Sequence, residues 1–207
     1  MNSIQIVNQE DIRFLISKDK VIQRIDKEFG APPDWRRKPD FESLSKIILG
    51  QQVSLESAES HFNKLKNYIG KFAPKNILKL SDEEMRSCFI SRQKSKYLRE
   101  LSDAILSERI IFEEFSRMND DEVKEKLISI KGIGNWTAEV FMLFCLQSKD
   151  IFPIGDIAVV NTIKELYEVT EREEIIRTAE KWKPCRSLAT FYMWHFYLTK
   201  RGRTAIY

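Results

Sequence analysis

The chain has few of the residues around which metal sites and disulfide frameworks are built. Only three of its 207 residues are cysteines, and Cys88, Cys145 and Cys185 lie far apart. They fit neither a disulfide framework nor the spacing of zinc ligands, so we expect three buried free thiols in a reducing compartment. The two histidines, His61 and His195, belong to no grouping with zinc-ligand spacing, and we expect structural roles for both.

Long apolar runs and strand-like alternation are missing as well. No apolar stretch approaches the roughly 18 residues needed to span a bilayer. The first residues lack the basic and apolar regions of a secretory signal, and the sequence has no internal repeat or low-complexity tract. We therefore expect an ordinary soluble globular protein with no membrane partner.

The overall charge does not identify a partner. Lys and Arg number 34 against 31 Asp and Glu, a net charge of +3, and 43% of the residues are hydrophobic. A local patch of charge matters more than this small sum, so nucleic acid binding is neither established nor excluded. The length suits one large domain or two small lobes.

Apolar residues recur with a period near 3.6 along most of the chain, which predicts helices. Serine, aspartate and asparagine at the starts and glycine at the ends divide this pattern into segments. We predict an all-α fold of about ten helices with short connections. The clearest segments are 21–29, 40–50, 54–70, 81–89, 97–105, 119–127, 156–167 and 186–200.

The most informative segment is 127–140, where Gly132 and Gly134 bracket Ile133 between two helical patterns. Glycine tolerates the positive φ that a tight hairpin needs, and its missing side chain lets another molecule approach the backbone. The amides from Gly132 to Asn135 lie at the start of the second helix, where they suit an anion. Because no nucleotide-binding strand pattern is present, we expect a phosphate of a nucleic acid backbone.

This helix, hairpin and helix are followed by Asp156, 22 residues beyond Gly134. The arrangement resembles the helix-hairpin-helix DNA glycosylases, and most of all the 3-methyladenine DNA glycosylase II family. Four segments carry the resemblance in the same order, namely 41–54, 130–138, 150–156 and 182–194. A single Gly-x-Gly is a weak signal, whereas four matched segments in order are a strong one.

The resemblance implies two helical lobes with a cleft between them. Residues 36–148 would form the lobe that holds the helix-hairpin-helix, and residues 1–35 plus 149–207 the lobe that carries the catalytic aspartate. The β-rich N-terminal domain of some members is expected to be absent, because only about 40 residues precede the first matched helix.

The implied activity is that of a monofunctional base-excision DNA glycosylase. It would hydrolyse the N-glycosidic bond of alkylated purines, of the 3-methyladenine and 7-methylguanine type, in duplex DNA. We expect a monomer whose partner is double-stranded DNA, cytoplasmic and nucleoid-associated in a prokaryote or nuclear in a eukaryote. Two alternatives stay open: a glycosylase for deaminated, mismatched or oxidised bases, and a non-catalytic DNA-binding protein.

Asp156 is the candidate catalytic residue. Cleavage of a glycosidic bond passes through a transition state that resembles an oxocarbenium ion, which a nearby carboxylate stabilises. The same carboxylate can orient or deprotonate the attacking water. The local sequence by itself favours a helix N-cap at this position, and both roles can coexist.

Aromatic residues are the candidates for the base pocket. A purine alkylated at N3 or N7 is positively charged, so it is attracted to aromatic faces and leaves without protonation. The resemblance places Trp136 and Trp194 in the pocket of a flipped base, with Val140 where some members have tyrosine. Core packing is an equally open role for either tryptophan. Trp136 also occupies the place, two residues after Gly134, of the lysine in strand-cutting members, so we expect no lyase activity.

A side chain normally fills the gap that base flipping leaves in the duplex. The resemblance places this wedge in the loop with Gln51 and Gln52, of which Gln52 is the better candidate. An ordinary polar loop at the end of a helix is the alternative.

The resemblance gives the hairpin two binding roles. Phosphate would be bound by the backbone of Gly132, Gly134 and Asn135, with a hydroxyl from Thr137. No cofactor is expected to be required. A structural Na⁺ or K⁺ would be held at the hairpin by the backbone carbonyls of Ile128, Ile130 and Gly132.

Overall fold

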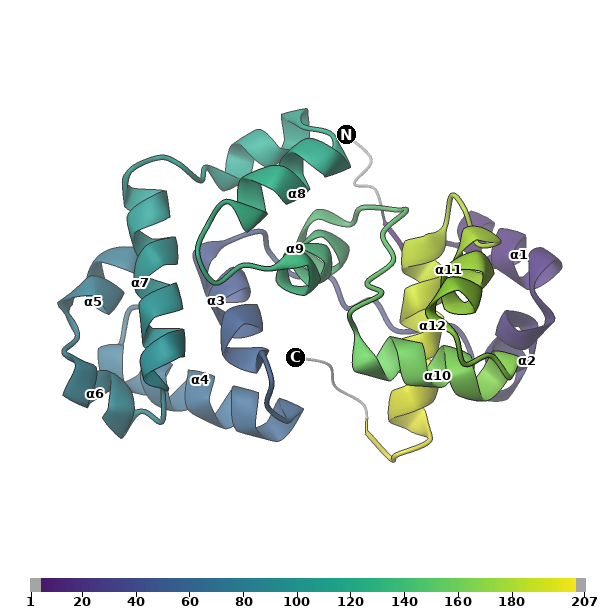
Figure 1. The fold of residues 1–207 in the computed structure, drawn as a ribbon, viewed down its shortest axis with the longest axis horizontal. Coiled ribbons are helices and arrows are strands. Elements are labelled where there is room, and N and C mark those ends of the chain that lie inside the picture. The colour runs from purple at the N-terminus through teal and green to yellow at the C-terminus, as the bar shows by residue number, and fades with distance from the viewer. Residues whose placement is uncertain (1–4, 204–207) are drawn as a thin grey trace. The chain divides into compact units, whose positions relative to one another are not determined.

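The structure, a computed structural model, describes residues 5–203, and every regular element in this range is helical (Figure 1). This confirms the predicted all-α class. The described residues divide into two compact units: unit 1 comprises residues 5–36 and 147–203, and unit 2 comprises residues 37–146. In the described range the elements are α1 (Gln9–Lys18), α2 (Lys20–Phe29), α3 (Phe41–Gly50), α4 (Leu55–Ile69), α5 (Pro74–Lys79), α6 (Asp82–Ser87), α7 (Arg92–Leu106), the 3-10 helix η1 (Phe112–Arg117), α8 (Asp120–Ile128), α9 (Asn135–Phe141), the π-helix η2 (Met142–Leu146), α10 (Ile157–Tyr167), α11 (Arg172–Glu180) and α12 (Arg186–Thr199).

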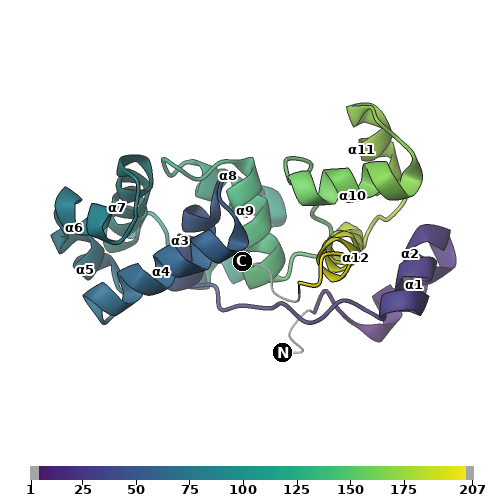
Figure 2. The ribbon, with the colours of Figure 1, turned by 90° about the horizontal axis from the view of Figure 1, so that it is seen from below.

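Helix α12 forms the core of unit 1. It contacts α10 and α11 as well as α1 and α2 (Figure 2). Phe191, Tyr192 and Trp194 are among its many buried residues, which are found on all sides of the helix. A helix that is apolar all round is typical of a protein interior, because no face is left to meet solvent.

A buried carboxylate, Asp19, joins the N-terminal helices of unit 1 to the rest of that unit. Its Oδ1 accepts hydrogen bonds from the amides of Val21 (2.8 Å) and Ile22 (3.1 Å), which caps α2. Its Oδ2 accepts from the hydroxyl of Tyr167 (2.8 Å) and the indole of Trp182 (2.9 Å). Four donors satisfy the carboxylate and hold α10 and the segment before α12 against α1 and α2.

Helix α3 lies at the centre of unit 2, where it contacts α4, α7 and α9. Its buried face includes Leu44, Ile47 and Ile48, none of which is exposed to solvent. Helix α5 lies along α7, and α8 and α9 are joined by the predicted tight hairpin (Figure 1). The hairpin is thus built on helices that are packed into the core of unit 2.

Candidate functional site

The two glycines of the hairpin serve different purposes. Gly132 has a φ of +98°, and a Cβ at this position would lie 2.2 Å from Cγ of Tyr97 on α7. Only glycine fits this conformation and this close approach. Gly134 has an ordinary φ of −93° and is the N-cap residue of α9, and a Cβ there would meet nothing within 4 Å. The space in front of Gly134 is therefore open to a ligand.

Gln51, which follows α3, holds the hairpin from within unit 2. Its Nε2 donates to the carbonyl oxygen of Gly132 (2.9 Å) and to Oγ1 of Thr137 (2.8 Å). Thr137 is only 2% exposed. In this structure the amide of Gln51 positions the hairpin, and its role as a wedge stays a prediction. The hydroxyl of Thr137 is turned inward, which does not favour a contact with phosphate.

Gln52 stays the candidate wedge. It is exposed, and its φ of +57° lies in the left-handed region that side chains other than glycine seldom adopt. Lys94 on α7 supports the start of this loop by donating from Nζ to the carbonyl of Leu49 (2.6 Å), near the C-terminus of α3. Burial lowers the pKa of Lys94. A residue with a strained backbone, such as Gln52, persists only where its surroundings fix it, and such residues are common at functional sites.

A pair of lysines makes the hairpin electropositive. Lys131 is an exposed residue of the hairpin, and its neighbour Lys96 on α7 is exposed as well. The side chain and the charge of Lys131 lower the pKa of Lys96. Two adjacent cations favour an anion beside the amides that begin α9. Sequence analysis overlooked Lys96, because only the fold brings it to Lys131.

Two of the three carbonyls that were predicted to bind a cation already accept hydrogen bonds. The carbonyl of Ile130 accepts from the amide of Ile133 (3.0 Å), and that of Gly132 accepts from Gln51. A carbonyl oxygen has two lone pairs, so each can take one further partner. The predicted cation site at Ile128, Ile130 and Gly132 stays a prediction.

An ion pair joins the two helices of the hairpin motif. Nζ of Lys124 on α8 lies 2.7 Å from Oε1 of Glu139 on α9. Glu139 is only 7% exposed, and burial raises its pKa although Lys124 acts in the opposite direction. The carboxylate is thus tolerated at neutral pH chiefly because Lys124 compensates it.

Replacing Lys124 with methionine is expected to destabilise the protein by about 3 kcal/mol at pH 7, because a buried carboxylate loses its partner. The folded state raises the pKa of Glu139, so it binds that proton more tightly than the unfolded state does. The loss of stability is therefore largest above the folded pKa and shrinks as the pH falls through it. Urea unfolding at pH 7 and pH 5 measures both values.

The double variant with Lys124→Met and Glu139→Gln is the control, and it should recover most of the lost stability. An equal loss at both pH values in the single variant would show that packing, and not the uncompensated charge, is responsible.

In unit 1, the segment that leads to Asp156 is fixed by the start of α12. Nε of Arg186 lies 2.8 Å from Oδ1 of Asp150, and Nη2 lies 3.0 Å from Oδ2, so the pair is bidentate. Oγ of Ser187 accepts from the amide of Ile151 (2.9 Å). Bidentate pairs of this kind fix geometry as well as supplying energy, and they set the path of the chain into Asp156.

Asp156 is the N-cap of α10. Its Oδ1 accepts from the amide of Val159 (3.0 Å) and from Nε1 of Trp194 on α12 (3.2 Å). The side chain is buried, with 3% of its surface exposed. The capping role that the local sequence favoured is therefore present, and the indole adds a second donor that capping does not require.

The predicted pocket residues differ in their exposure. Trp194 is 2% exposed and packs on Phe191, with ring centroids 5.9 Å apart. The structure thus favours Trp194 as a hydrogen-bond donor to Asp156 over a surface on which a base stacks. Val140 is fully buried, so a base could contact it only if its neighbours moved. Trp136 is partly exposed in the first turn of α9.

The predicted pocket draws on both units. Unit 2 contains Trp136 and Val140, and unit 1 contains Asp156 and Trp194. The pocket that they would share stays a prediction.

The cysteines do not take part in this site. All three are free and buried, as predicted, and burial raises the pKa of Cys145 to about 12 and that of Cys185 to about 11. Between residues 5 and 203, no group of His, Cys, Asp and Glu side chains is arranged to hold a metal ion. In the same range no helix combines the length and the apolar surface needed to cross a membrane.

Two relatives are similar to this chain along most of its length. DNA-3-methyladenine glycosylase 1 of Schizosaccharomyces pombe is 30% identical over 165 residues, which cover 76% of this chain and 72% of the relative. A DNA-3-methyladenine glycosylase of Bacillus subtilis is 31% identical over 172 residues, covering 75% of this chain and 57% of the relative.

A solved structure agrees with these relationships. The S. pombe 3-methyladenine DNA glycosylase in complex with abasic DNA superimposes with a TM-score of 0.81 at 28% identity, over 90% of this chain and 95% of that one. The family model for HhH-GPD superfamily base excision DNA repair proteins matches residues 45–185, which include the hairpin and Asp156. The chain therefore belongs to the HhH-GPD superfamily of base excision DNA repair proteins.

Proposed function

We propose that this protein is a monofunctional DNA glycosylase that removes alkylated purines, of the 3-methyladenine and 7-methylguanine type, from duplex DNA. The observation that carries this proposal is the buried carboxylate of Asp156, held by a helix N-terminus and by the indole of Trp194. A cap that served only the helix would not need a carboxylate, a buried position or an indole donor. The relatives named as 3-methyladenine glycosylases give the same substrate class.

The reaction breaks the bond between C1′ of the deoxyribose and the nitrogen of the base. The bonding electrons leave with the alkylated purine, which departs as a neutral base because it carried a positive charge beforehand. The carboxylate of Asp156 stabilises the oxocarbenium ion that remains and orients the water that attacks it. Water supplies the new oxygen at C1′, and its proton passes to the carboxylate or to solvent.

No covalent enzyme intermediate is required. Strand-cutting members of the superfamily need a lysine two residues after the second hairpin glycine, and this position is Trp136. The product is therefore an intact strand with an abasic site. We further propose that the protein acts as a monomer, without a required cofactor, in the compartment that holds the DNA.

Duplex DNA is bound through the hairpin. The open space at Gly134, the amides at the start of α9, and the adjacent Lys96 and Lys131 support a phosphate at this place. Gly134→Asp should weaken the binding of any duplex severely, because it adds a side chain and a negative charge where the phosphate lies. Unchanged affinity at moderate salt would remove the hairpin from the interface.

A panel of lesions tests the substrate class. Purified protein is incubated with duplexes that contain 3-methyladenine, 7-methylguanine, hypoxanthine, uracil or 8-oxoguanine, and released bases and abasic sites are measured. We expect release of the two alkylated purines and no product that borohydride traps on the protein. Preferred release of hypoxanthine, uracil or 8-oxoguanine would favour the rival glycosylase, and no release from any duplex would favour a non-catalytic DNA-binding protein.

Trp194→Phe should slow base excision by about tenfold, because Asp156 loses the donor that orients its carboxylate. The variant should also be less stable, since a large buried side chain becomes smaller. The matched control is Phe191→Leu, which disturbs the packing of the same helix but leaves the hydrogen bond to Asp156. Single-turnover rates are measured well below both unfolding temperatures, and equal slowing in the two variants would refute the positioning role.

A further inference from the structure

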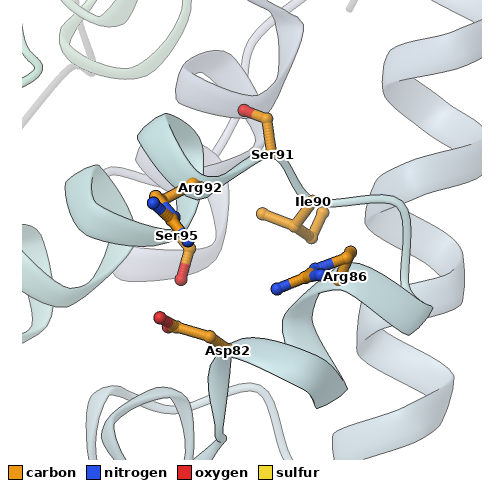
Figure 3. A pocket seen from close by; sticks show the side chains of 6 residues that line it. All are labelled: Asp82, Arg86, Ile90, Ser91, Arg92 and Ser95. Carbon is orange, nitrogen blue, oxygen red and sulfur yellow. The ribbon is translucent and has the colours of Figure 1, made fainter.

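A pocket of about 260 Å³ lies in unit 2, between α6 and the first turn of α7. It is lined by Asp82, Arg86, Ile90, Ser91, Arg92 and Ser95 (Figure 3). None of these residues belongs to the hairpin, to the loop of Gln52 or to the segment of Asp156. The pocket is therefore distinct from the site described above.

The inner wall of the pocket carries an unsatisfied hydroxyl group. Ser95 is 4% exposed, and its Oγ has no hydrogen-bond partner. Figure 3 shows this oxygen pointing into the space between Asp82 and Arg86. Ser102, a buried serine farther along the same helix, instead donates to the carbonyl of Leu98 (2.7 Å). Buried polar groups are almost always hydrogen-bonded. Oγ of Ser45 and Oγ1 of Thr190 also lack a partner, but Ser95 lines a pocket, so its hydroxyl can meet a partner from outside the chain.

The charges around this hydroxyl favour an anion. The guanidinium groups of Arg86 and Arg92 are exposed and make no side-chain hydrogen bond or ion pair with any described residue. Asp82, the acidic residue of the pocket, is compensated by Arg99, whose Nη2 lies 3.2 Å from its Oδ1. Two unpaired cations thus face a single carboxylate that already has a partner.

The first turn of α7 adds backbone donors. Oγ of Ser91 accepts a hydrogen bond from the amide of Lys94 (3.3 Å). The amides before Lys94 in the first turn have no carbonyl partner within the helix. The helix has 15 residues, so its N-terminus carries a substantial partial positive charge. These donors lie beside Arg92 and Ser91, both of which line the pocket.

We propose that this pocket binds a phosphate group. The guanidinium groups of Arg86 and Arg92 would pair with its charge, and Oγ of Ser95 would donate a hydrogen bond to one of its oxygens. Two arginines exclude a metal cation, and Ile90 alone offers too little apolar surface for an apolar ligand. The phosphate can come from a DNA backbone or from a free phosphate or phosphate ester. The inference does not rest on the proposed function, because the pocket can bind free phosphate whether or not the protein excises bases.

The first arm of the test uses inorganic phosphate and the full-length protein. Phosphate is titrated while the amide NMR signals of residues 92–95 are followed, with chloride at equal ionic strength as the reference. We expect saturable shifts, and a loss of affinity of about tenfold or more in Ser95→Ala and in the double variant Arg86→Gln with Arg92→Gln. Arg109→Gln, beyond the opposite end of α7, is the matched control and should bind as the wild type does.

Ser95→Ala gives an independent readout. Alanine fills the buried position without an unsatisfied hydroxyl, so the variant should be at least as thermostable as the wild type in phosphate-free buffer. Added phosphate should raise the unfolding temperature of the wild type more than that of the variant. An equal rise in both proteins would argue against a bond from Ser95.

The second arm measures affinity for an undamaged duplex as a function of salt. If the pocket holds a backbone phosphate, the slope of log K against log salt should be smaller in magnitude by about 1 to 2 in the Arg86 and Arg92 double variant than in the wild type. The slope should be unchanged in Arg109→Gln. An unchanged slope together with phosphate-dependent shifts assigns the pocket to a free phosphate. An unchanged slope without such shifts overturns the proposal, and base excision by the same preparation shows separately whether the glycosylase assignment holds.

Discussion

Replacing Asp156 with asparagine is expected to slow base excision by about 10²- to 10⁴-fold, the range that a positioned acid–base group contributes. Asparagine caps a helix as well as aspartate does. Its amide oxygen can also accept the hydrogen bonds that Val159 and Trp194 donate to Oδ1. The substitution therefore removes the charge at the reacting sugar and keeps the local geometry.

Single-turnover excision of an alkylated purine measures this rate, and thermal unfolding measures the cost to the fold. We expect a change in stability of no more than about 1 kcal/mol, because the substitution loses only the interaction of the charge with the α10 dipole. Asp40 provides the matched control, because it caps α3 through the amide of Ser43 (2.8 Å) in the other unit. Asp40→Asn should leave the rate unchanged. Wild-type excision by Asp156→Asn would assign Asp156 to helix capping alone.

The fold could be predicted well where apolar periodicity was long and its ends were marked. The hairpin is the clearest case, because two glycines one residue apart interrupt two apolar patterns. Helices α1, α5 and α11 were not predicted. Neither α5 nor α11 ends at a glycine, and Ala73 and Glu171 at their starts are not among the residues that mark a helix N-terminus in a sequence. These helices are stabilised by packing in the tertiary structure rather than by a pattern of their own.

The site was harder to predict, because its supporting contacts join residues far apart in the chain. Gln51 bonds to Gly132, 81 positions away, and Trp194 bonds to Asp156, 38 positions away. Sequence motifs identify such residues one at a time and do not indicate which way each side chain points. The motifs thus suggested a wedge for Gln51 and a stacking surface for Trp194, and they did not indicate the hydrogen bond by which each fixes another functional element.

Replacing Gly132 with alanine should destabilise the protein by about 2 to 5 kcal/mol, the sum of backbone strain and overpacking. The φ of +98° is unfavourable for any residue with a side chain, and the new Cβ would lie 2.2 Å from Cγ and 2.6 Å from Cβ of Tyr97. These atoms are the inner part of the tyrosine, so they cannot move away without shifting α7. Urea unfolding measures the loss, and duplex binding should weaken in parallel, because the hairpin would be displaced.

The second hairpin glycine is the internal control. Gly134→Ala should change stability by no more than about 1 kcal/mol, since its φ is −93° and a Cβ there has no neighbour within 4 Å. A double-mutant cycle then separates the two causes of the loss at Gly132. If the clash dominates, Gly132→Ala should cost much less in a Tyr97→Gly background, which removes Cβ as well as the ring, with a coupling of about 1 to 3 kcal/mol. If the strained φ dominates, the cost should be the same in both backgrounds, and a loss at Gly134 equal to that at Gly132 would contradict the close contact with Tyr97.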